Sequence, residues 1–160
     1  MNNIHPTAVI GPNVVLGENV YIGPYCVIGY PAEHKKFWGK WGRVVIGDNV
    51  VLTGHVTIDA GTEDSTEIAS GVWMLKHSHV GHDAYIGANT VISCGAKIGG
   101  HCYISENCNI GLNAVIHQRQ HISHGCMIGM GAVVTKKLIT VPYRKYAGVP
   151  AVDIGVNIKK

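Results

Sequence analysis

The chain has 160 residues, of which 46% are hydrophobic and 14% are charged, and its formal net charge is +3. This size and apolar content suit one domain with a buried core, and the weak, scattered positive charge argues against a nucleic-acid partner. The first residues do not resemble a signal peptide, and no apolar run reaches the roughly 18 residues that a membrane span requires. We therefore expect a cytoplasmic protein without a membrane span.

A bulky aliphatic residue returns at every sixth position from the N-terminus. The first residues of this series are Ile4, Ile10, Leu16, Ile22 and Ile28. A small or short side chain follows four positions later, as in Ala8, Val14, Val20 and Cys26. A period of six fits neither the 3.6-residue helix nor the plain alternation of a strand, so the pattern indicates an internal repeat.

The repeat stops at Tyr30, and residues 30–45 are predicted to form an inserted loop. Its central part, PAEHKKFWGKWGR, interleaves aromatic with basic side chains. An insertion at a corner of a coiled chain must lie on the outside, where loops often carry function. The aromatic residues therefore either pack against a neighbouring subunit or contact substrate directly. The repeat resumes at Ile46, and a second break is predicted at 61–67.

The longest unbroken run of the repeat extends from Ile68 to Ile139. Its aliphatic members are Ile68, Met74, Val80, Ile86, Ile92, Ile98, Ile104, Ile110, Ile116, Ile122, Ile128 and Val134. Short strands joined by turns, three to a circuit, would wind such a chain into a triangular prism with the aliphatic residues inside. We therefore predict an all-β fold, a parallel β-helix forming one domain over 1–160, with a C-terminal tail at 140–160.

Four of the five cysteines occupy the small inward position of the repeat: Cys26, Cys102, Cys108 and Cys126. Free cysteine packs like a small hydrophobic residue, and cytosolic thiols stay reduced. No CxxC motif is present. We therefore expect core packing from these cysteines, and no metal.

Hexads that are three apart should stack on one side of the prism, and this places several polar side chains in line. His82, Gly100, Gln118 and Lys136 share the same position of the repeat, and His79, His101 and His117 lie beside it. An imidazole suits the deprotonation of a hydroxyl or amine acceptor, because its ordinary pKa lies near neutrality. Asp83 would influence the tautomer or basicity of His82, and Lys136 is placed to meet a phosphate.

The pattern resembles the hexapeptide-repeat acyltransferases, which have a left-handed parallel β-helix. The segment HSHVGHD, from His77 to Asp83, is similar to AHIAHD in the UDP-N-acetylglucosamine acyltransferases of bacterial lipid A synthesis. IGGH and AVIHQ also match this family, and IGYPAEHKKFWGKWGRVVIGD fits its long loop without a gap. The resemblance covers most of residues 4–145.

The resemblance implies roles for individual residues. His82 would be the general base and Asp83 its partner. The substrate-binding positions would be His79, His101, His117, Gln118, Lys36, His34 and Met130. Family members are trimers with sites between neighbouring subunits, which implies a homotrimer here.

The chain also departs from the lipid A enzymes, and the departures affect substrate choice. Those enzymes continue into a helical C-terminal domain, which we do not expect here. The ending VVTKK, then AGVPA, looks more like coenzyme A-dependent sugar acetyltransferases, so Lys136 and Lys137 would contact the coenzyme. His34 and Asp59 replace family Asp and His residues, and Met130, at the position that limits acyl-chain length, implies a short acyl group.

These features predict transfer of a short acyl group from acetyl-CoA, or another acyl-CoA, to a hydroxyl or amino group of a nucleotide sugar. One alternative is transfer from acyl carrier protein, as in the lipid A enzymes. A second is a γ-class carbonic anhydrase-like metal enzyme, because His77 and His82 show the five-residue spacing of two of its ligands. A non-catalytic β-helix scaffold is the third.

Overall fold

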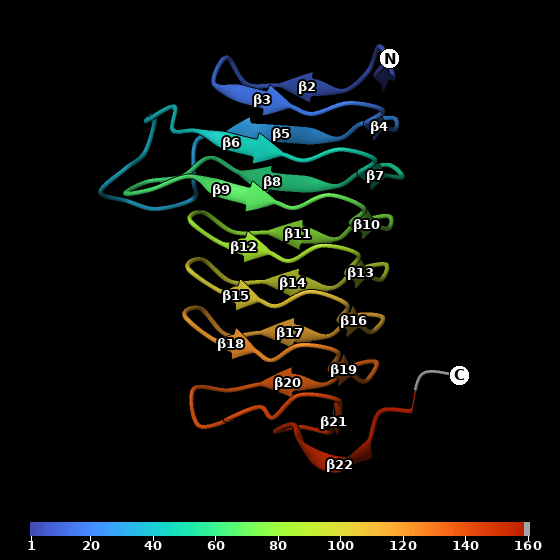
Figure 1. Ribbon diagram of the computed structural model, residues 1–160. Coiled ribbons are helices and arrows are strands. Elements are labelled where there is room, and N and C mark those ends of the chain that lie inside the picture. The colour runs from blue at the N-terminus through green and yellow to red at the C-terminus, as the bar shows by residue number, and fades with distance from the viewer. Residues whose placement is uncertain (159–160) are drawn as a thin grey trace.

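The computed structural model describes residues 1–158, which form a β-helix of three sheets, parallel throughout except at the C-terminal hairpin (Figure 1). The first sheet contains β1 (Asn3–Ile4), β4 (Tyr21–Ile22), β7 (Val51–Leu52), β10 (Trp73–Met74), β13 (Val91–Ile92), β16 (Asn109–Ile110), β19 (Met127–Ile128), β21 (Arg144–Ala147) and β22 (Val152–Val156). The second contains β2 (Val9–Ile10), β5 (Val27–Tyr30), β8 (Thr57–Asp59), β11 (His79–Val80), β14 (Lys97–Ile98), β17 (Val115–Ile116) and β20 (Val133–Val134). The third contains β3 (Val14–Leu16), β6 (Val44–Ile46), β9 (Thr66–Ile68), β12 (Tyr85–Ile86), β15 (Tyr103–Ile104) and β18 (His121–Ile122).

The register of the sheets confirms that three hexads make one circuit. In the second sheet Val80 pairs with Ile98, and Ile98 pairs with Ile116, so equivalent residues lie directly above one another. Neighbouring coils are therefore separated by the usual strand spacing of roughly 4.8 Å. Within the described chain no helix is long and apolar enough to cross a membrane.

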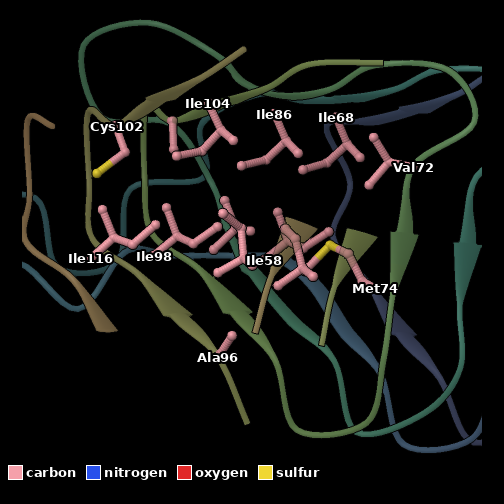
Figure 2. Close-up of a cluster of buried hydrophobic side chains, with 14 of the residues drawn as sticks. Ile58, Ile68, Val72, Met74, Ile86, Ala96, Ile98, Cys102, Ile104 and Ile116 are labelled. Atoms are coloured by element: carbon pink, nitrogen blue, oxygen red, sulfur yellow. The ribbon is translucent and has the colours of Figure 1, made fainter. Parts of the chain in front are cut away.

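The interior is filled by the repeating aliphatic residues, as the six-residue period predicts. Figure 2 shows Ile68, Ile86 and Ile104, from three successive coils, in one row and Ile58, Ile98 and Ile116 in another, where Val80 fills the coil between Ile58 and Ile98. The four cysteines of the small inward position are buried beside them, which confirms their packing role: Cys26, Cys102, Cys108 and Cys126. Removal of this apolar surface from water is the main source of stability for the coil.

The turns that lead from the second sheet to the third form one corner of the prism, which we call the insertion corner. Both interruptions of the repeat project from it, one at 31–43 between β5 and β6, the other at 60–65 between β8 and β9 (Figure 1). Asp83 and His101 occupy equivalent positions of this corner in successive coils, with φ angles of 57° and 56°. Asp and His tolerate this left-handed conformation better than β-branched residues do.

Two of the predicted boundaries differ from those in the structure. The insertion ends at 43 and the second break spans 60–65, because Val44 and Thr66 already fill the buried position two residues before the repeat aliphatic. The C-terminal tail also contains regular secondary structure. Its strands β21 and β22 form an antiparallel hairpin that adds to the first sheet, and Arg144 pairs with Asp153 across it at 2.8 Å.

Candidate active site

His82 and Asp83 occupy the turn after β11, at the insertion corner. The Nδ1 atom of His82 lies 2.7 Å from Oδ2 of Asp83, although the two residues are adjacent in the chain. When Nδ1 donates its proton to this carboxylate, Nε2 carries the free lone pair and can accept a proton. The His82 side chain is 15% exposed, so its ring remains within reach of a ligand.

Asp83 is held by four donors from the second break of the repeat. Its Oδ1 accepts the backbone N–H groups of Thr62, Glu63 and Asp64 at 2.8, 3.1 and 2.8 Å. Its Oδ2 accepts the Thr62 hydroxyl at 2.6 Å. Burial alone would raise the pKa of Asp83, but the hydrogen bonds from Thr62, His82 and the backbone outweigh it and hold this pKa well below its ordinary value. The carboxylate therefore stays ionised beside the imidazole.

His101 joins the pair from the next coil. Its Nε2 lies 3.6 Å from Oδ2 of Asp83, and its ring is 5.0 Å from that of His82 in an edge-to-face arrangement. Burial and the nearby Arg119 guanidinium lower the pKa of His101, which favours the neutral ring. A neutral imidazole still offers one N–H to a bound ligand.

Gly100 provides the space in which the His82 ring lies. A Cβ atom at this position would come within 2.8 Å of Nε2 of His82, which is closer than real Cβ contacts. The absence of a side chain at Gly100 therefore lets the His82 ring point along the corner towards the next coil.

The longer insertion reaches the same site. The His34 ring lies edge-to-face against His82 at a centroid distance of 5.7 Å. Lys36 donates its backbone N–H to Nδ1 of His34 at 3.3 Å, while its ammonium group lies 5.1 Å from the Phe37 ring centroid. Lys40 donates to the carbonyl oxygen of Thr62 at 2.5 Å, which joins the two insertions.

A pocket of about 530 Å³ lies on the face of the second sheet next to this cluster. His79 and Asp59 contribute to its lining. The Nδ1 atom of His79 lies 2.8 Å from the Thr57 hydroxyl, and its Nε2 lies 3.9 Å from Oδ2 of Asp59. Burial, followed by the charge of Glu33, raises the pKa of Asp59 to about 6. Burial and the nearby Lys97 ammonium lower the pKa of His79.

The remaining predicted residues lie farther along the β-helix. His117, Lys136 and Lys137 line a cavity of about 560 Å³ together with Val149 and Pro150. The imidazole of His117 binds the carbonyl oxygen of Gln118 at 2.9 Å, and the Gln118 side chain is exposed.

Met130 is placed apart from this group. It is 75% exposed in the turn between β19 and β20, which belongs to the corner between the first and second sheets. Within one chain it therefore lies across the second sheet from the insertion corner.

The structure thus brings His82, Asp83, His101 and His34 into one cluster, with His79 in the adjoining pocket. Thr62 was missed by sequence reasoning, which treated its segment only as a break. Sequence reasoning also missed a column of stacked rings on the opposite corner, Tyr25, His55 and His77, with centroid distances of 5.0 and 4.8 Å. The two insertions make the sequence spacings within this column unequal, which hides it from a search at a fixed period.

A metal ion is a second possible occupant of the cluster. His82, Asp83 and His101 each offer one ligand atom within 4.8 Å of the others. However, both oxygens of Asp83 already accept hydrogen bonds from the 62–64 segment, which favours the role of an anchored carboxylate over that of a metal ligand. His77 lies at the opposite end of β11 from His82, so the spacing typical of the carbonic anhydrases does not join these two residues in one chain. The expectation of no metal stays a prediction.

Comparison with known protein families and with characterised proteins finds relatives that share the six-residue repeat. The bacterial transferase hexapeptide family (six repeats) matches residues 1–30. An acyl-[acyl-carrier-protein]–UDP-N-acetylglucosamine O-acyltransferase of Xylella fastidiosa is 35% identical over 74 residues, which cover 44% of this chain and 28% of that enzyme. A UDP-3-O-acylglucosamine N-acyltransferase of Colwellia psychrerythraea is 38% identical over 69 residues, which cover 41% and 20%. The matches therefore span less than a third of the length of these relatives.

Solved structures match over nearly the whole chain. LpxA from Bacteroides fragilis 9343, a UDP-N-acetylglucosamine acyltransferase, has a TM-score of 0.80 at 27% identity, covering 96% of this chain and 74% of that one. The Francisella novicida UDP-N-acetylglucosamine acyltransferase has a TM-score of 0.79 at 25% identity, covering 98% and 69%. PerB from Caulobacter crescentus, at 23% identity and a TM-score of 0.61, covers 96% and 57% and shares the fold. The chain therefore has the fold of a left-handed β-helix built from six-residue repeats, and it is similar to the UDP-N-acetylglucosamine acyltransferases.

Proposed function

We propose that this protein transfers a short acyl group from acetyl-CoA, or another acyl-CoA, to a hydroxyl or amino group of a nucleotide sugar. His82 is the general base. The observation that carries this proposal is the 2.7 Å contact between Nδ1 of His82 and the anchored Asp83 carboxylate, which leaves Nε2 free to accept a proton.

In the proposed reaction, His82 and Asp83 end in the protonation states in which they began. The acceptor hydroxyl or amine gives a proton to Nε2 of His82 while its oxygen or nitrogen attacks the thioester carbonyl carbon. The Asp83 carboxylate stabilises the imidazolium that forms. The tetrahedral intermediate then expels the coenzyme thiolate, which takes the proton from His82.

The pocket beside His79 and Asp59 is the proposed site for the acceptor sugar. It lies next to the base and is lined by groups that can form hydrogen bonds, including Thr57 and Lys97. His34 approaches the base from the insertion, and His34 and Lys36 would contact the same ligand. The relatives in the comparison act on UDP-linked glucosamine derivatives, which supports a nucleotide sugar as the acceptor.

The cavity lined by His117, Lys136 and Lys137 is the proposed site for the acyl donor. Two exposed lysines there favour a ligand with phosphate groups, and Val149 and Pro150 supply apolar surface for its linking arm. Gln118 lies between this cavity and the base on the same corner. Met130 would limit acyl length from the opposite corner, which is possible where two subunits meet.

This arrangement supports a homotrimer, because one flat-sided prism cannot enclose a ligand on its outer face. Cyclic symmetry would place the second sheet of one subunit against its neighbour and create three sites. Exposed aromatic residues on the first sheet, Tyr21 and Trp73, support further protein contact there. Light scattering should give about three times the mass of one chain, and a mass near one chain would contradict the shared site.

The test of the proposed function compares donors and variants. Purified protein is supplied with a panel of nucleotide sugars and either acetyl-CoA or acyl carrier protein donors, and free thiol release is followed. His82→Ala should lower the rate by about 10²- to 10⁴-fold, the usual contribution of general base catalysis. His5→Ala serves as the matched control, because His5 is exposed and, among residues 1–158, its ring bonds only with Thr7, at 2.8 Å. Equal rates for His82→Ala and the wild type would refute the proposal.

Acyl transfer from acyl carrier protein is the second candidate. It is favoured by the similarity to several acyl-[acyl-carrier-protein]–UDP-N-acetylglucosamine O-acyltransferases, which use this donor. Product formation with acyl carrier protein donors and none with acetyl-CoA would select it, while leaving the assignment of His82 intact.

A further inference from the structure

Thr62 contacts Asp83 of the catalytic pair with two of its groups and the longer insertion with a third, although the sequence pattern placed it in a simple break. It is 4% exposed. Its N–H donates to Oδ1 of Asp83 at 2.8 Å and its hydroxyl donates to Oδ2 at 2.6 Å. Its carbonyl oxygen accepts from Lys40 of the longer insertion at 2.5 Å.

The hydroxyl acts on the oxygen atom that faces the base. Oδ2 of Asp83 has two imidazoles near it, His82 at 2.7 Å and His101 at 3.6 Å. The three backbone N–H groups of residues 62–64 all bond to Oδ1. They therefore fix the position of Oδ1 but not the direction in which Oδ2 points. The Thr62 hydroxyl fixes the second oxygen and therefore decides which imidazole it faces.

The segment that carries Thr62 is tightly packed against the longer insertion. A Cβ atom at Gly61 would lie 1.8 Å from the carbonyl oxygen of Asp64, and one at Gly42 would lie 1.7 Å from the carbonyl oxygen of Gly61. Both positions therefore require glycine. Gly61 also donates its N–H to the carbonyl oxygen of Arg43 at 3.2 Å. The two insertions thus pack against each other, and the hydrogen bond from Lys40 of the longer insertion to Thr62 of the shorter one joins them.

We infer that Thr62 is a positioning residue, which orients Asp83 so that His82 keeps its proton on Nδ1 and its lone pair on Nε2. Lys40 and the longer insertion support Thr62 in this role. The kinetic part of this inference rests on the proposed function, whereas the orientation of the imidazole does not.

Thr62→Val tests the hydroxyl, because valine keeps the shape of threonine and the backbone N–H. The tautomer of His82 is measured without substrate, from the imidazole nitrogen chemical shifts, with assignment by comparison with His82→Ala. We expect the Nδ1–H tautomer to dominate in the wild type and in Thr62→Ser, and a mixture of tautomers in Thr62→Val. With acceptor and acyl donor, kcat should fall by about tenfold in Thr62→Val, part of the 10²–10⁴ of general base catalysis, while KM stays within twofold.

The matched control is Thr90→Val. Thr90 is fully buried, and its hydroxyl donates to the carbonyl oxygen of Ser105 at 3.2 Å, but it lies away from the site. This variant should keep the wild-type tautomer and kcat even if its melting temperature falls. If Thr62→Val does not fold, Thr62→Ala is measured against the same criteria.

Two results would overturn the inference. One is a wild-type tautomer in Thr62→Val, and the other is an equal loss of kcat in Thr62→Val and Thr62→Ser. Should the wild type transfer no acyl group to any acceptor, the proposed function fails, and the chemical shifts still decide whether Thr62 orients His82.

Discussion

Asp59→Asn should stabilise the protein at neutral pH. Burial and the charge of Glu33 raise the pKa of Asp59 from its ordinary value of 3.8 to about 6 in the folded chain. One pKa unit corresponds to about 1.36 kcal/mol, so the ionised carboxylate costs the fold about 3 kcal/mol above pH 7. Asparagine has nearly the same shape and removes this charge.

The effect must depend on pH in a defined direction. A raised carboxyl pKa favours the folded state when the group is protonated, and this advantage is lost as the pH rises through the folded-state pKa of about 6. The gain from Asp59→Asn should therefore be below about 1 kcal/mol at pH 4 and reach about 3 kcal/mol at pH 8.

Denaturant unfolding of both proteins at pH 4, 6 and 8, followed by circular dichroism, measures this gain. Asp83→Asn provides a contrast of opposite sign. The pKa of Asp83 is lowered, so its negative charge stabilises the fold at any pH above the ordinary pKa of an aspartate, and removing the charge should reduce stability. An Asp59→Asn variant that is less stable than the wild type at pH 8, or whose gain is the same at every pH, would refute the reasoning.

Two further predictions concern the His82 ring and the core of the coil. Gly100→Ala should lower kcat by at least tenfold with little change in melting temperature, because the new methyl group would meet Nε2 of His82 at 2.8 Å; unchanged turnover would show that Nε2 does not need this space. Ile98→Ala should reduce the free energy of unfolding by about 2–5 kcal/mol, because Ile98 is fully buried in the stack of isoleucines. The exposed Ile154 supplies the comparison, and its replacement by alanine should change stability by less than about 0.5 kcal/mol.

The fold was predictable from sequence because one short pattern repeats through nearly the whole chain. Each aliphatic of the series from Ile68 to Val134 is buried, as the period requires. The pattern also fixes which residues stack, so the alignment of His82 with Gly100 and the approach of His101 could be predicted from the count of hexads. A repeat protein allows this because each coil contacts only its neighbours.

The rest of the site depends on parts of the chain that do not repeat. Thr62 and His34 lie in the two insertions, where no period predicts a position. The pKa of Asp59 depends on burial and on Glu33, which the winding of the chain brings beside it. These features arise from tertiary packing of irregular loops, and a pattern of residue types does not encode the direction of a hydroxyl or a carboxylate.

The stacking of coils also sets the distance between the two proposed ligand sites. His82 and Lys136 occupy the same position of coils that are three apart, so their separation is a whole number of strand spacings, roughly 14 Å in total. Deleting or adding 18 residues between them would change this separation in steps of roughly 4.8 Å while the isoleucines stay in register. In this β-helix, the distance between the donor site and the acceptor site can therefore change only by whole coils.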